Sequence, residues 1–171
     1  MKEVLNNSIL KPKNGRAMIE TLSVMLLLIL LGTGCFSLSL SSFGAYKRLN
    51  DAREKSTELR IASSFIVTKI RQNDVAGSID VKPEPITGKN ALVIYEHIDG
   101  ESYATWIYYS AGYLMEALVL EHEEPSPDVS QQIAKVDDFN IEYDRDVQRI
   151  STSISIDGLR PYNSTATVRS K

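Results

Sequence analysis

The chain begins with a basic stretch that is followed by a long apolar segment. Residues 21–46 contain no charged side chain and open with the block LSVMLLLILL. An α-helix rises about 1.5 Å per residue, so about 20 apolar residues cross a hydrocarbon core of roughly 30 Å. The later part, GTGCFSLSLSSFGA, is rich in Gly and Ser, which either allow close approach of a neighbouring helix or bond back to the preceding turn. The pattern predicts a single transmembrane helix over residues 16–46.

Apolar and small side chains then recur at steps of three and four residues, which is the spacing of one helix face. They are Leu49, Ala52, Ser56, Leu59, Ser63, Ile66 and Ile70. No proline lies between Pro12 and Pro83, so an amphipathic helix over residues 47–74 is predicted to continue the apolar segment without a break. It is expected to end near Asn73 and Asp74, which favour turns. A weak stripe that contains Ser and Ala favours packing on a sheet over a coiled-coil stalk.

Short runs of strand-forming residues occupy the remainder of the chain, residues 75–171. They are SIDV, ALVIYEHI, YATWIYYS, YLMEALVLE, QIAKV, FNIEYD, ISTSISID and STATVR, with turn signals such as IDGE and SAGY between them. The segment EHEEPSPDVSQ is the clearest loop. Because no helical pattern separates the runs, antiparallel pairing is expected. The expected fold class is α+β, a long N-terminal helix packed on an antiparallel β-sheet.

Charge is distributed unevenly along the chain. The first 20 residues hold four basic and two acidic side chains, whereas the whole chain holds 19 basic and 22 acidic ones. The outer part is therefore mildly acidic, and no nucleic-acid partner is expected. The basic start predicts a cytoplasmic N-terminus and an extracytoplasmic C-terminal domain on a single-pass protein of the cell membrane, although Lys47, Arg48 and Arg53 on the far flank reduce the asymmetry.

The residues in front of the apolar segment, KPKNGRAMIETL, combine a basic leader over residues 1–15 with Gly15 and, five places later, Glu20. This arrangement resembles the prepilin signal of the type IV pilin and pseudopilin superfamily. The resemblance implies a pilin-like fold, cleavage by a prepilin peptidase between Gly15 and Arg16, and assembly with other pilin-like subunits. Arg16 stands where that family usually has phenylalanine or methionine.

Glu20 lies at the margin of the predicted span. A carboxylate there is costly unless it is paired, and the free amine of a neighbouring subunit's first residue is a suitable partner. Glu20 would then help to set the register between subunits during assembly. The alternative is that Glu20 lies among the lipid headgroups and ends the span.

The globular part carries a second resemblance, over about residues 45–155. It rests on TKIRQND at 68–74, IDGESY at 98–103, IYY at 107–109 and GYLME at 112–116. These motifs resemble an uncharacterised family of small membrane-anchored proteins from Gram-positive bacteria, which look like minor pseudopilins of competence or type II secretion machinery. The resemblance implies a fold and an assembly role, and it supplies no catalytic residue.

Two other processing signals are partly present in the chain. Cys35, the one cysteine, excludes an intramolecular disulfide and suggests a lipoprotein signal, but Gly32, Thr33 and Gly34 before it fit that signal poorly. Ordinary secretory cleavage after Ser42 or Gly44 would follow an apolar region longer than is typical of a removable signal.

Candidate chemistry is sparse. The two histidines, His97 and His122, lie at no metal-ligand spacing, and no nucleophile elbow or phosphate-binding loop appears. The aromatic run Trp106, Tyr108 and Tyr109 fits a core better than a stacking platform. We therefore expect no catalytic residue, metal or cofactor, and a role as a minor pilin or pseudopilin-like subunit of a type IV pilus, competence or type II secretion-type filament. The alternatives are an anchored binding module without a filament role, lipoprotein or not, and a membrane-tethered enzyme.

Overall fold

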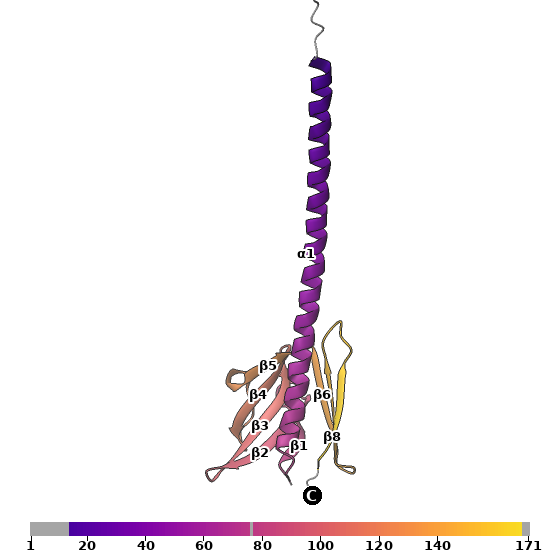
Figure 1. Ribbon diagram of the computed structural model, residues 1–171. Coiled ribbons are helices and arrows are strands. Elements are labelled where there is room, and N and C mark those ends of the chain that lie inside the picture. Colours follow the sequence, from indigo (N-terminus) through magenta and orange to yellow (C-terminus); the bar gives the residue numbers. More distant parts are fainter. Residues whose placement is uncertain (1–13, 76, 169–171) are drawn as a thin grey trace, which may run out of the picture. The chain divides into compact units, whose positions relative to one another are not determined.

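The computed structural model describes residues 14–75 and 77–168 (Figure 1). The chain divides into two compact units, Met1–Leu49 and Asn50–Lys171, which are described separately below. Helix α1, Asn14–Gln72, runs through 59 residues. The predicted uninterrupted helix is thus confirmed. It ends where expected. The backbone N–H of Asn73 makes a last helical bond to the Lys69 carbonyl at 3.2 Å, and the Asn73 side-chain amide caps the same carbonyl at 3.0 Å.

All strands belong to the second unit, and the predicted strand runs are confirmed. They are β1 Ile79–Pro83, β2 Asn90–Ile98, β3 Glu101–Ser110, β4 Tyr113–Leu120, β5 Gln131–Lys135, β6 Asp138–Asp144, β7 Arg149–Ser155 and β8 Tyr162–Thr167. The loop before β5 holds a short 3₁₀ helix, η1, Pro127–Val129. Every pairing is antiparallel. The fold class is α+β, a long N-terminal helix packed on antiparallel sheets.

The expectation of one sheet is wrong, because the strands form two. Strands β1 to β5 form a five-stranded sheet in chain order, and β6 to β8 form a three-stranded one. The backbone N–H of Lys135, at the end of β5, donates to the Glu58 carboxylate of α1 at 2.9 Å. That N–H is therefore already satisfied by the helix. The next strand, β6, contacts β1, β2 and β3 instead.

The last part of α1 and one face of each sheet share the main core (Figure 1). The helix contributes Ala62, Ile66 and Ile70, the larger sheet contributes Leu92, Ile94, Ile107 and Leu114, and the smaller sheet contributes Phe139, Ile141, Ile150 and Ile154. Side chains alternate between the two faces of a strand, so the residues between these face the other way. In β2 to β4 they form a second cluster around Val93, Trp106 and Met115. The centre of the larger sheet is therefore buried on both faces.

The predicted helix stripe is confirmed only in its later part. Ser63, Ile66 and Ile70 are buried and Leu59 is half-buried. Ala52 and Ser56 are exposed. Packing of the helix on the sheets thus begins near Leu59, which a continuous stripe in the sequence does not reveal.

An ion pair fastens the helix to the larger sheet beside the core. Lys69 Nζ lies 2.6 Å from Glu116 Oε1 in β4, and both side chains are largely shielded from solvent. Each charged group loses hydrating water on burial, and the attraction to its partner offsets part of that loss.

Candidate functional site

The first unit is an exposed apolar helix. The large apolar side chains from Met18 to Phe43 are 58–74% exposed. An apolar surface of this extent is typical of a contact with lipid or with a partner protein. Helix α1 is the one helix in the described part of the chain that is long and apolar enough to cross a membrane, and its place near the N-terminus also fits a signal sequence.

The predicted processing and assembly residues lie at the start of this helix. The backbone of Gly15 and Arg16 is helical, and Glu20 is exposed one turn further along. Residues 1–13, which make up most of the predicted leader, lie outside the described residues. Hydroxyl groups in the helix are satisfied locally, since Thr21 donates to the Ala17 carbonyl and Ser39 to the Cys35 carbonyl, at 2.8 and 2.9 Å.

In the second unit, residues 51–58 of α1 border an acidic cleft of about 430 Å³. Its helix side carries Asp51, Glu54, Lys55 and Glu58, and its other side carries Lys135, Asp137 and Asp157. Lys55 Nζ donates to the Asp157 carbonyl at 2.8 Å, and the Asp157 N–H donates to Asp137 Oδ2 at 2.6 Å. These bonds hold the linkers that follow β5 and β7 against the helix.

A groove of about 580 Å³ lies on the opposite flank of the helix. Val67 and Arg71 of α1 line one wall, and Ser164, Thr165 and Ala166 of β8 line the other. Arg71, like Arg53 and Arg60, is exposed. Within residues 14–75 and 77–168, no hydrogen bond or ion pair is found for the guanidinium group of these three arginines. These three guanidinium groups therefore carry positive charge that no described residue pairs.

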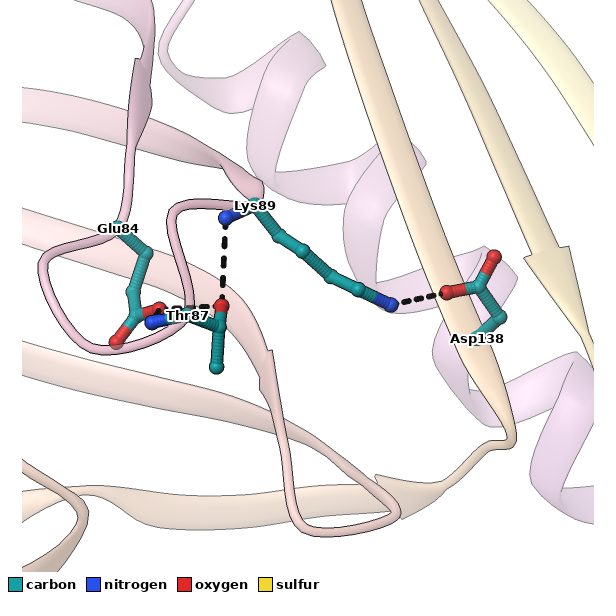
Figure 2. A network of polar contacts seen from close by, with 4 residues as sticks. All are labelled: Glu84, Thr87, Lys89 and Asp138. Atoms are coloured by element: carbon teal, nitrogen blue, oxygen red, sulfur yellow. Dashed lines mark hydrogen bonds and ion pairs between the residues drawn. The ribbon is translucent and has the colours of Figure 1, made fainter.

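The most deeply buried acidic side chain within residues 14–75 and 77–168 belongs to a turn. Glu84 is 1% exposed and follows β1. Its carboxylate accepts the backbone N–H groups of Ile86 and Thr87 at 2.9 and 2.7 Å and the Thr87 hydroxyl at 2.6 Å. Figure 2 shows this turn. Glu84 replaces the water that these donors would otherwise bind, so its role is structural.

The same turn joins the two sheets. Lys89 Nζ donates to Asp138 Oδ1 of β6 at 2.7 Å, and its backbone N–H donates to the Thr87 hydroxyl at 3.3 Å (Figure 2). The hydrogen bond to the Asp138 carboxylate raises the pKa of Lys89 above its ordinary value.

The aromatic side chains of the run in β3 lie inside the fold. Trp106 and Tyr108 are 8% and 1% exposed, and Tyr109 packs against the main core. The Tyr108 hydroxyl lies 2.7 Å from the Ser130 hydroxyl, and burial raises the pKa of Tyr108. These side chains therefore form no open stacking surface.

The residues considered for metal binding lie apart. His97 Nδ1 lies 3.2 Å from the Ser102 hydroxyl in the neighbouring strand, and His122 lies in the exposed loop after β4. In the part of the chain that the structure describes, no group of three or more His, Cys, Asp or Glu side chains is arranged to hold a metal ion.

Two features were missed in the sequence analysis. The turn carboxylate has a local signal, since Glu84 is followed three residues later by Thr87 and then by Gly88, which has a φ of 70°. The opposite charges on the two flanks of the helix also have a signal in the sequence, which is a regular spacing. Asp51 and Glu58 lie seven residues apart, as do Arg53 and Arg60, and seven residues correspond to about two helical turns.

Comparison with known proteins places the globular part in a family. No curated protein and no solved structure matches the chain. One family model matches residues 57–155, from within α1 to the end of β7, and this range includes all four motifs noted above. The expectation that this part of the chain belongs to a family without an assigned function is confirmed. The chain belongs to the family described as a domain of unknown function, DUF4860.

Proposed function

We propose that this protein is a minor pilin or pseudopilin-like subunit of a type IV pilus, competence or type II secretion-type filament. One observation carries the proposal. Helix α1 is continuous over 59 residues, with an apolar, exposed first part and a last part that packs on antiparallel sheets. A plain tether needs only the first part. The combination suits a subunit that is held in a membrane and packs beside similar helices.

A subunit of this kind has defined partners and a defined location. The membrane receives the apolar part of α1, a prepilin peptidase acts between Gly15 and Arg16, and other pilin-like subunits surround the helix. The sheet domain lies outside the cytoplasmic membrane. No catalytic role is assigned, and no cofactor or nucleic acid takes part.

Processing at Gly15 gives the first test. The full chain is co-expressed with a prepilin peptidase, and the N-terminus is determined by mass spectrometry. We expect a mature chain that begins at Arg16, and we expect Gly15→Val to abolish this product. An intact leader in both chains would leave an anchored binding module, and a lipid on Cys35 would identify a lipoprotein.

Glu20 gives the second test. In the mature chain its carboxylate is expected to pair with the N-terminal amine of a neighbouring subunit, so that Glu20→Val leaves that amine unpaired in the membrane. The variant should be processed normally but should assemble at least about tenfold less into sedimentable filaments, which corresponds to about 1.4 kcal/mol. Glu3→Val, in the leader, is the control. Normal assembly of the Glu20 variant would show that this carboxylate lies among headgroups.

A further inference from the structure

Helix α1 presents two rows of opposite charge within residues 50–72. Asp51, Glu54 and Glu58 form the acidic row, since steps of three and four residues keep side chains on one side of a helix. Arg53, Arg60 and Arg71 form the basic row, because steps of seven and eleven residues correspond to about two and three turns. The two cavities place the rows on different flanks, since Asp51, Glu54 and Glu58 line the acidic cleft and Arg71 lines the groove beside β8.

An uncharged ridge separates the rows. It consists of Thr57, Ile61, Ser64 and Thr68, which are all exposed. These side chains are small apart from Ile61, which is 42% exposed. A ridge of this kind allows another helix to approach, whereas charged residues along it would have to be desolvated.

We propose that a second copy of this chain docks on the helix, with the basic row of one copy against the acidic row of the next. This inference deepens the proposed function, because it names the contact between neighbouring subunits.

Charge complementarity identifies the partner. In each row, two charges lie seven residues apart, about 10 Å along the helix, so Arg53 and Arg60 of one copy can meet Asp51 and Glu58 of the next at the same time. Copies anchored in one membrane have parallel helices, which keeps the two spacings aligned. Glu58 binds the Lys135 N–H through Oε2, and a carboxylate has acceptor capacity for a further donor.

The position of the rows on different flanks also determines the kind of assembly. A contact between two different surfaces leaves one row of each kind free at the ends of a pair, so further copies can add. Exposed ion pairs contribute only about 0–1 kcal/mol each. The contact is therefore weak in solution, and it depends on the high effective concentration that a shared membrane provides.

Charge reversal in the full chain tests this contact. Energy transfer is measured between donor-labelled and acceptor-labelled copies in lipid vesicles at a fixed ratio of protein to lipid. The first variant, Arg53→Glu, puts a carboxylate opposite Asp51 of the next copy. The second variant, Asp51→Lys, puts an ammonium group opposite Arg53 of the next copy and leaves the Glu58 contact in place.

Each variant alone is expected to associate about tenfold less than the original chain. A mixture of the two should return to within about twofold, because the new carboxylate at position 53 meets the new ammonium group at position 51 while Arg60 still meets Glu58. This recovery also shows that both variants are folded. Arg149→Glu and Glu96→Lys make the same changes in charge on exposed residues away from the helix and should leave association unchanged. Unchanged association of the helix variants, or a mixture that does not recover, would overturn the proposal.

The outcome can be separated from that of the processing test. Association that depends on the two rows, in a chain whose leader is not cleaved, would support this contact and argue against the filament role. A chain that is cleaved at Gly15 but does not associate through the rows would do the opposite.

Discussion

Replacing Ile66 with alanine is expected to destabilise the sheet domain by about 2–5 kcal/mol. Ile66 is fully buried at the point where α1 meets both sheets, in one cluster with Leu92, Ile107 and Phe139. Removing its three outer carbon atoms leaves a cavity that strands on two sides would have to close. Unfolding of the full chain in detergent micelles with guanidinium chloride, followed by the fluorescence of the single, buried Trp106, measures the change.

Ile61 provides a matched control in the same helix. It is the same residue type, about one and a half turns away, but 42% exposed. Ile61→Ala should cost less than about 1 kcal/mol, because little apolar surface is returned to water and no cavity forms. Equal losses in the two variants would mean that the helix does not pack on the sheets through Ile66.

Replacing Glu84 with alanine is expected to destabilise the same domain by about 2–3 kcal/mol, since hydrogen bonds to charged groups contribute more than neutral ones. The substitution leaves two backbone N–H groups and the Thr87 hydroxyl without their acceptor. It also loosens the turn that carries Lys89 towards Asp138 of the other sheet (Figure 2). The same unfolding experiment measures the loss.

Two further variants make this experiment specific. Glu84→Gln should lose about half as much, because an amide keeps one acceptor oxygen but turns a donor towards the N–H groups of the turn. Glu142→Ala, at an exposed position in β6, should change stability by less than about 0.5 kcal/mol. If Glu84→Ala lost no more stability than Glu142→Ala, water would replace the carboxylate at no cost, and the turn would have no structural role.

Local signals were sufficient for the secondary structure. Hydrophobic spacing and the lack of proline indicated the continuous helix, and turn residues located the hairpins. In the β2–β3 turn, Asp99 and Gly100 have φ values of 53° and 90°, and in the β3–β4 turn Ala111 and Gly112 have values of 48° and 87°. Hairpin turns with two residues need this left-handed backbone, which explains why IDGE and SAGY were reliable signals.

The arrangement of the strands could not be predicted in the same way. A strand that faces a core on one side shows the same alternation whichever sheet it joins, so the break between β5 and β6 has no local signal. Trp106 is an example of what a local pattern cannot predict. Its spacing favoured a core position, but its place in a second cluster, on the face that points away from the main core, depends on the pairing of β2, β3 and β4.

The candidate sites also differ in how far the sequence alone defines them. Gly15, Arg16 and Glu20 are defined by their order along the chain, and their proposed roles follow from a membrane and a peptidase that act on a linear segment. The acidic and basic rows on the helix could be recognised as surfaces only from the structure. Sequence spacing indicates that Arg53 and Arg60 share a side, but only the packed sheets show that this side remains exposed, with the acidic residues on the other flank.

The sequence alone therefore determined the elements of this protein and the apolar nature of its first helix, because these depend on neighbouring residues and on periodicity. The tertiary structure decided the division into two sheets, the burial of Glu84 and the part of the stripe that packs. Those features depend on contacts between residues that are far apart in the chain, such as Glu58 with Lys135 and Lys89 with Asp138. Such contacts form only when the whole domain has folded, so no local pattern specifies them.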